Sequence, residues 1–169
     1  MTRSLPRYTA ADLEYLNTVT FSNITNDDAV ALGLCAIEVI QEWKLNLAVE
    51  IVVNDDVLFK AKLKDTNRDN DLWLTGKSAV AVRFKEPSLL VKLRHLEAGS
   101  PFENRADIDH GKFKAHGGSI PLRVGDDVVG TITMSGEPDA LDHEAAAEAL
   151  ARFSRGREAA PGHTRSPGE

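Results

Sequence analysis

The sequence predicts a single α+β domain in which an antiparallel sheet of four or five strands packs against several helices. Two segments each consist of two β-branched runs around a short turn rich in Asn, Asp or Gly, which is the pattern of a β-hairpin. Apolar residues at helical spacing precede, separate and follow these segments. The order helix, hairpin, helices, hairpin, helix favours an α+β fold with both hairpins in one sheet. A chain of 169 residues is long enough to bury its own core.

The first two predicted elements are helices with recognisable starts. Thr9 and Asp12 have the spacing of a capping box, which predicts a short helix over residues 9–16. Short polar residues at 25–28 precede a stripe of apolar and small residues, which predicts a longer helix over residues 26–43.

The periodicity then changes several times along the chain. Pro121 near the start of one predicted strand places that strand at an edge of the sheet, since proline cannot donate to the ladder. Residues 102–114 are polar and irregular, which predicts a surface loop. The remaining predicted elements are a hairpin with strands 47–53 and 57–63, helices 68–84 and 88–96, a second hairpin with strands 120–124 and 128–135, and a final helix 140–153.

The C-terminal residues lack an apolar stripe. We expect residues 1–155 to form the domain and residues 156–169 to be a disordered tail.

Composition excludes several classes of protein. The chain is 42% hydrophobic and 27% charged, and its apolar runs are too short to span a membrane. A net charge of −6 with dispersed basic residues argues against nucleic-acid binding. One cysteine, Cys35, excludes an intrachain disulfide, and no secretory signal is visible at the N-terminus. We therefore expect a cytoplasmic protein with neither a membrane nor a nucleic-acid partner.

Two histidines flank the second predicted hairpin and form the first candidate site. His116 precedes Gly117 and Gly118, which can bring the backbone close to a ligand. His143 lies in the first turn of the last predicted helix, on its apolar stripe. The pair could bind a small molecule, for which the backbone amides beside His116 favour an anion or carboxylate, or it could bind a divalent metal with a nearby carboxylate. The alternative is structural: the glycines form the turn into the strand, and His143 is a buried core residue.

A second candidate site lies on the predicted helix 68–84. Asn70, Trp73 and Lys77 fall on one helical face, where an indole, an ammonium and an amide could form one wall of a pocket. In the structural alternative, Trp73 is buried against the sheet and Lys77 pairs with a carboxylate.

Four ordered motifs in the chain resemble the haem-degrading-domain superfamily, also called HbpS-like, GlcG-like or PduO C-terminal-like, and within it the branch of small stand-alone proteins. The motifs are Asp28-Ala29-x-x-Leu32-Gly33, Asp65-Thr66-x-x-Asp69-Asn70-x-x-Trp73-Leu74-x-Gly76-Lys77, His116-Gly117-Gly118-x-x-Pro121, and Gly130-Thr131-Ile132-x-x-Ser135-Gly136 with Asp142-His143. The resemblance implies a profilin-like fold and assembly into a homo-oligomer, either a dimer or a larger ring. It also implies haem or another tetrapyrrole as a candidate ligand. The chain departs from the pattern at Glu137, where an apolar residue usually follows Ser-Gly.

Three functions remain open from the sequence. We favour a non-enzymatic, oligomeric small-molecule-binding or accessory protein. One alternative is a metal- or haem-dependent enzyme that uses His116 and His143. The other is a non-catalytic oligomeric scaffold for protein partners.

Overall fold

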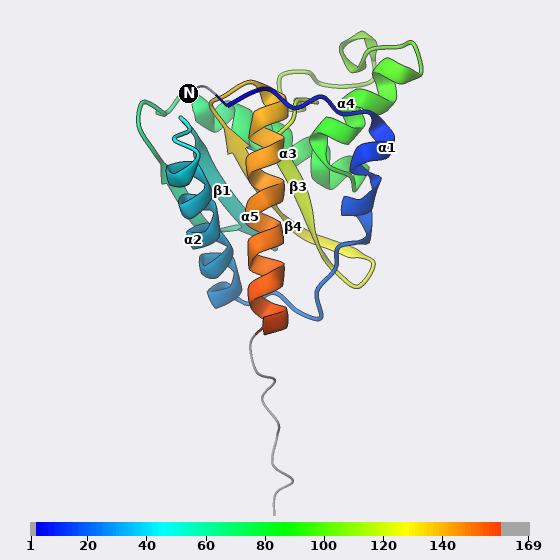
Figure 1. Cartoon of the computed structure of the whole chain (residues 1–169). Helices are drawn as coiled ribbons and strands as arrows, with labels where there is room; N and C mark the ends of the chain where they lie inside the picture. Colours follow the sequence, from blue (N-terminus) through cyan, green and yellow to red (C-terminus); the bar gives the residue numbers. More distant parts are fainter. Residues whose placement is uncertain (1–2, 160–169) are drawn as a thin grey trace, which may run out of the picture.

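The computed structural model describes residues 3–159 and has the predicted α+β architecture (Figure 1). Its four strands form one antiparallel sheet in the order β2-β1-β4-β3, so the two hairpins meet along the central pair β1 and β4. The strands are β1 (Ala48–Val53), β2 (Asp56–Lys62), β3 (Ser119–Val124) and β4 (Asp127–Ser135).

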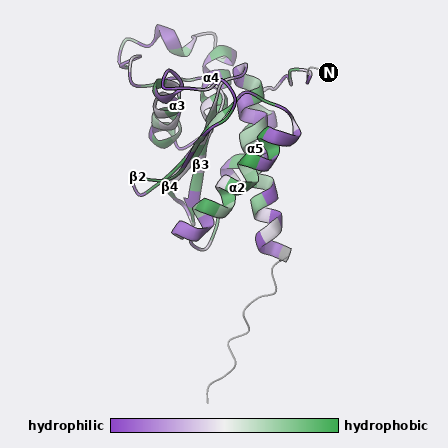
Figure 2. Ribbon diagram, turned by 90° about the vertical axis from the view of Figure 1, so that its left-hand side faces the viewer, coloured by the Kyte–Doolittle hydropathy of each residue, from purple (hydrophilic) through white to green (hydrophobic). Residues whose placement is uncertain are grey.

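Helices lie on both faces of the sheet. The helical elements are α1 (Ala10–Leu13), the short 3-10 helix η1 (Glu14–Thr18), α2 (Asn26–Glu42), α3 (Asn70–Phe84), α4 (Ser88–Glu97), the 3-10 helix η2 (Phe102–Asn104) and α5 (Asp139–Ala159). The long helices α2 and α5 run side by side over one face, and α3 covers part of the other (Figures 1 and 2). No helix in residues 3–159 is both long and apolar enough to cross a membrane.

Local sequence explains the starts of the helices and the turns of the hairpins. The backbone N–H of Thr25 donates to Asp28, and the Thr25 hydroxyl accepts from the Asp28 N–H, which is a complete capping box at the start of α2. Asn54 and Asp55 both have positive φ in the two-residue turn of the first hairpin, which suits the right-handed twist of its strands. Pro121 lies in the edge strand β3, as its sequence position predicted.

The two faces of the sheet differ in chemistry. Ile51, Ile120 and Ile132 are paired across neighbouring strands and pack in the main core with α2 and α5. The opposite face, beneath α3, carries a row of buried hydroxyl side chains: Ser119, Thr131, Thr133 and Ser135. Three of these hydroxyls have partners: the Ser119 and Thr133 oxygens lie 2.9 Å apart, and the Thr131 oxygen lies 2.7 Å from that of Ser78 in α3. The sheet therefore has one apolar face and one polar face that is nonetheless buried.

The segment predicted as a surface loop, residues 102–114, contains a small core of its own. Phe102 and Ile108 are buried there with Val80 and Val91, from α3 and α4. Their spacing fits neither a helix nor a strand, which explains why the sequence pattern did not reveal them.

Helix α5 is longer than predicted. It continues past residue 153 to Ala159, so residues 156–159, assigned from sequence to the tail, are helical. Arg157 explains the extension: its guanidinium lies 3.1 Å from the Asp28 carboxylate and stacks near Phe21 and Phe153. The rest of the predicted tail lies outside the described residues.

Candidate ligand-binding site

A cavity of about 390 Å³ opens where β4 leads into α5. Its lining comes from α3, from the segment before β3 and from the β4–α5 junction: Asn70, Trp73, Lys77, His116, Ser135, Gly136, Glu137, Asp139 and Asp142. The structure thus brings together two sequence motifs that were treated as separate candidate sites, the α3 face and the turn at His116.

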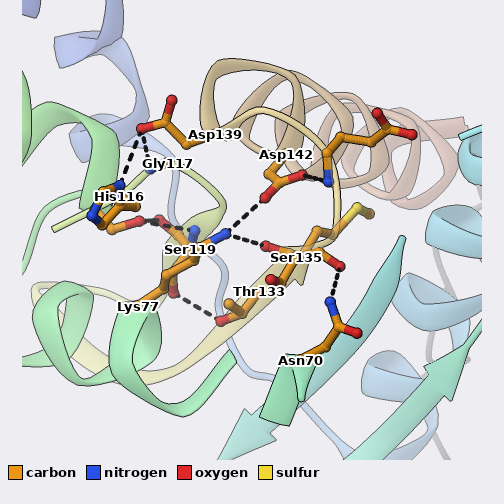
Figure 3. A network of polar contacts seen from close by, with 12 residues as sticks. Asn70, Lys77, His116, Gly117, Ser119, Thr133, Ser135, Asp139 and Asp142 are labelled. Atoms are coloured by element: carbon orange, nitrogen blue, oxygen red, sulfur yellow. Dashed lines mark hydrogen bonds and ion pairs between the residues drawn. The ribbon is translucent and has the colours of Figure 1, made fainter. Parts of the chain in front are cut away.

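The Lys77 side chain is buried in the wall of this site and forms an ion pair with Asp142. The Lys77 Nζ atom is 2.7 Å from Asp142 Oδ2 and also donates to the Met134 carbonyl oxygen at 3.1 Å (Figure 3). The two side chains are only 3% and 2% exposed. Burial raises the pKa of Asp142 to about 6 although Lys77 opposes the rise, so the carboxylate is ionised at neutral pH. The suggestion that Lys77 pairs with a carboxylate is therefore correct.

The same carboxylate organises the β4–α5 junction. Asp142 Oδ1 accepts the Glu137 backbone N–H at 2.9 Å. The Glu137 side chain in turn accepts the Asn46 backbone N–H at 2.8 Å, which ties the junction to the entry of β1. Asn70, the first residue of α3, donates to the Ser135 carbonyl oxygen at 3.4 Å. One side of the cavity is consequently held by contacts between three distant parts of the chain.

On the other side of the cavity, Asp139 joins the start of α5 to α4 and to the segment before β3. Its Oδ2 atom lies 2.7 Å from Lys92 Nζ, accepts the Gly117 N–H at 3.1 Å, and is 3.8 Å from His116 Nδ1. Burial acts to raise the pKa of Asp139, but the Lys92 ammonium and the Gly117 N–H outweigh it, and the pKa is lowered. Asp139 is thus an ionised carboxylate already paired with a cation.

Trp73 and His116 form an aromatic corner of the cavity. Their rings meet edge to face with centroids 5.3 Å apart. The Trp73 side chain is exposed, so the alternative in which it packs against the sheet is wrong. Burial, with the nearby Lys92 ammonium, lowers the pKa of His116, which is therefore neutral at pH 7. The corner offers an apolar surface and one uncharged imidazole.

The two glycines allow the chain to pass between α5 and Lys77. A Cβ on Gly118, where φ is +136°, would lie 2.3 Å from the Met134 carbonyl oxygen and 3.1 Å from Lys77 Nζ. A Cβ on Gly117 would lie 2.2 Å from the Asp139 carbonyl oxygen. The Gly117 N–H already donates to Asp139, so this amide is not free for an anion. The glycines shape the cavity through the space that they leave.

His143 occupies a different position from His116. It is 1% exposed, contacts the Tyr8 ring edge to face at 5.5 Å, and is not among the described residues that line the cavity. Burial lowers the pKa of His143 to about 4, so its imidazole is neutral at neutral pH. Within residues 3–159 no three or more His, Cys, Asp or Glu side chains are grouped so that they could hold a metal ion.

Sequence reasoning underestimated the acidic residues of the site. Glu137, Asp139 and Asp142 crowd the start of α5, where acids are favourable through the helix dipole alone. The spacing of Asp139 and Asp142 resembles a capping box and predicts Asp139 as the helix cap. That prediction is wrong, because Asp139 is the first helical residue and Asp142 accepts the N–H of Glu137. The available signal was Lys77 on an inward stripe, because a buried lysine requires an acid from elsewhere in the chain.

The chain is similar in sequence to several known proteins. The family described as haem degrading protein HbpS-like matches residues 24–151. A UPF0303 protein of Streptomyces coelicolor is 40% identical over 147 residues, covering 86% of this chain and 93% of that protein. A UPF0303 protein of Serratia proteamaculans is 31% identical over 137 residues, covering 80% of this chain and 85% of its own length.

Solved structures share the fold at lower identity. The Ybr137w protein superposes with a TM-score of 0.76 at 23% identity, covering 87% of this chain and 88% of that one. HbpS superposes with a TM-score of 0.63 at 20% identity, covering 79% and 93% of the two chains. A PduOC:heme complex gives 0.62 at 22% identity, covering 79% and 94%. With the sequence match over residues 24–151, these similarities show that the chain belongs to the HbpS-like family.

Proposed function

We propose that this chain is a binding protein for a small polar molecule, held in the cavity between α3 and the start of α5. The observation that carries the proposal is the buried Lys77–Asp142 pair, whose two residues both line the cavity. A buried ion pair stabilises a fold weakly or not at all, because both charges must leave water. Its place in a cavity wall is better explained by a ligand that uses its polar atoms.

The hydrogen-bonding capacity of the wall supports this role. Lys77 has three N–H donors, and within residues 3–159 two of them have partners, Asp142 and Met134. Trp73 and His116 add a rigid aromatic surface beside these polar groups. The cavity therefore combines one apolar corner with several fixed polar groups, which suits a small polar molecule better than an apolar one.

Haem is the ligand that the family resemblance suggests, and the residues of this cavity do not fit it. A tetrapyrrole needs two extensive apolar walls and cations for its propionates. The lining is largely polar, with the carboxylates Glu137, Asp139 and Asp142, and its one lysine, Lys77, is already paired. His116 could reach a metal from the rim, but nothing else in the lining suits the macrocycle. We therefore assign no haem to this cavity.

A two-histidine centre receives no support either. His116 is at the cavity and His143 is buried against Tyr8 outside its lining. Binding by the Lys77 side of the cavity is therefore our proposal, rather than catalysis by His116 and His143.

The test uses Trp73 as the reporter. In a Trp43→Phe background Trp73 is the remaining tryptophan, so its fluorescence reports the cavity. A panel of small polar metabolites, and hemin separately, is titrated into this variant and into its His116→Ala derivative. We expect a polar ligand to bind saturably and to bind at least tenfold more weakly after the His116 change. Hemin binding that His116→Ala leaves unchanged would place any haem site elsewhere. Failure of every polar ligand to bind would refute the proposal.

Assembly and location belong to the same proposal. We propose a cytoplasmic homo-oligomer, with the single cysteine supporting a reducing compartment. Exposed apolar side chains at Val57, Leu72 and Val82 supply surface that a second copy could bury. Light scattering that gives the mass of a monomer at micromolar concentration would contradict the oligomer.

A further inference from the structure

We infer that the cavity selects its ligand by charge: it takes a small amine, amide or polyol that is neutral or cationic, and it discriminates against anions. This inference rests on the proposed function and specifies the class of molecule bound there. It follows from two facts: the cations around the cavity are already paired with aspartates, and the Glu137 carboxylate in the lining is not paired with a cation among the described residues.

The cations of the site are neutralised by aspartates. Lys77 pairs with Asp142 at 2.7 Å, and Lys92, which is not among the described lining residues, pairs with Asp139 at 2.7 Å. His116 is neutral and lies beside these pairs. An anionic ligand would have to compete for one of these ammonium groups with an aspartate carboxylate that is already 2.7 Å from the ammonium nitrogen.

The remaining charge in the lining is negative. Glu137 accepts the Asn46 N–H through Oε1, and among residues 3–159 no lysine, arginine or histidine lies within ion-pair distance of its carboxylate. Asp139 uses Oδ2 for both Lys92 and Gly117, which leaves Oδ1 able to accept another hydrogen bond. The wall consequently offers acceptors to a ligand that carries N–H or O–H groups.

Two further groups define the rest of the ligand. The third N–H of Lys77 can donate to one ligand oxygen, such as a hydroxyl or an amide carbonyl. The Trp73 ring supplies an apolar surface for a short carbon skeleton. Lys114 is a cation near the site, 5.4 Å from the Trp73 ring centroid, but its Nζ donates to the His110 carbonyl oxygen and it is not part of the lining. The complementary molecule therefore combines donors for carboxylates with an acceptor for Lys77.

Three probes of nearly equal size separate the effect of charge from that of shape. Ethanolamine is cationic, glycolamide is neutral and glycolate is anionic, and each carries a hydroxyl group. The indole N–H signals of the two tryptophans are followed by NMR at millimolar probe concentrations, with Trp43, outside the cavity lining, as the internal control. We expect ethanolamine and glycolamide to shift the Trp73 signal with at least about tenfold tighter binding than glycolate.

A variant that removes one negative charge tests whether Glu137 is responsible for the preference for a cationic ligand. Glu137→Gln retains an oxygen that can accept the Asn46 N–H, and it should weaken ethanolamine binding about fivefold while it leaves glycolamide binding unchanged. Glu38→Gln makes the same change on the exposed surface of α2 and should leave the affinities of all three probes unchanged.

The outcomes separate the two proposals. If glycolate binds as tightly as glycolamide, the charge selection is wrong and the binding function stands. An unchanged ethanolamine affinity in Glu137→Gln would also overturn the charge selection. If no probe shifts the Trp73 signal, the binding function fails, and the charge selection fails with it.

Discussion

The buried ion pair makes a quantitative prediction about stability. Lys77→Met removes the ammonium and retains most of the side-chain volume, which leaves the Asp142 carboxylate buried without its cation. Asp142→Asn removes the negative charge and retains an oxygen for the Glu137 N–H. Because the side chains are 3% and 2% exposed, water cannot compensate either loss. Each single change should lower the free energy of unfolding by about 3–5 kcal/mol.

The double variant distinguishes an ion pair from two independent losses. With both charges removed, no uncompensated charge remains in the site, although Met134 still loses the donor to its carbonyl oxygen. The double variant should therefore be less destabilised than the sum of the two single variants, with a coupling energy of about 2–3 kcal/mol. If the losses of the two single variants simply added, the double variant would lose most of the roughly 5–15 kcal/mol that stabilises a typical domain.

Urea unfolding at pH 7, followed by circular dichroism, measures all four proteins of this cycle. Their m values should agree, so that differences in midpoint report stability. A coupling energy below about 0.5 kcal/mol would mean that Lys77 and Asp142 do not interact as described, and it would remove the main support for the proposed site.

Three further predictions concern other parts of the structure. Gly118→Ala should destabilise the fold by about 3 kcal/mol or more in urea unfolding, because the new Cβ would meet the Met134 carbonyl oxygen at 2.3 Å. Gly125→Ala, which has open space around its Cβ, should cost about 1 kcal/mol, and equal losses in the two variants would contradict the steric explanation. The pKa of His143 is about 4 in the folded protein against 6.5 in the unfolded chain, so the unfolded chain takes up the proton first and the protein should lose about 3 kcal/mol of stability as pH falls from 6.5 to 4. His143→Leu should flatten this dependence of unfolding free energy on pH, and an unchanged slope would refute the lowered pKa of His143. Thr133→Val should lower the free energy of unfolding by about 1–3 kcal/mol, because it leaves the buried Ser119 hydroxyl of β3 without its partner. Unchanged stability in thermal unfolding would show that this hydroxyl pair contributes nothing.

Local signals predicted the elements of this fold well. Short polar residues at 25–28 predicted the start of α2, where Thr25 and Asp28 form a capping box, and the turn rich in Asn and Asp predicted the first hairpin. Pro121 correctly indicated an edge strand. These signals succeed because the energies involved act within a few residues of one another.

The site was harder to predict because it depends on contacts between distant residues. Alternating Thr131, Thr133 and Ser135 would ordinarily indicate a strand face in water, yet α3 buries all three. Lys77 required a partner that lay 65 residues away, in a cluster of acids that the helix dipole also explained. Trp73 shares a helical face with the buried Lys77, yet its side chain is exposed at the cavity. Periodicity places a residue on a face and does not reveal what covers that face.

The long sequence separations around the cavity have a consequence for folding. Lys77 and Asp142 are 65 positions apart, and the Asn46–Glu137 contact spans 91 positions. We expect contacts between such distant residues to form after the local helices and hairpins, because the entropy of closing the intervening chain is lost before these contacts contribute. The cavity therefore does not exist in a partly folded chain that has formed only its local helices and hairpins. A ligand that binds there should slow global unfolding while it leaves the folding rate nearly unchanged.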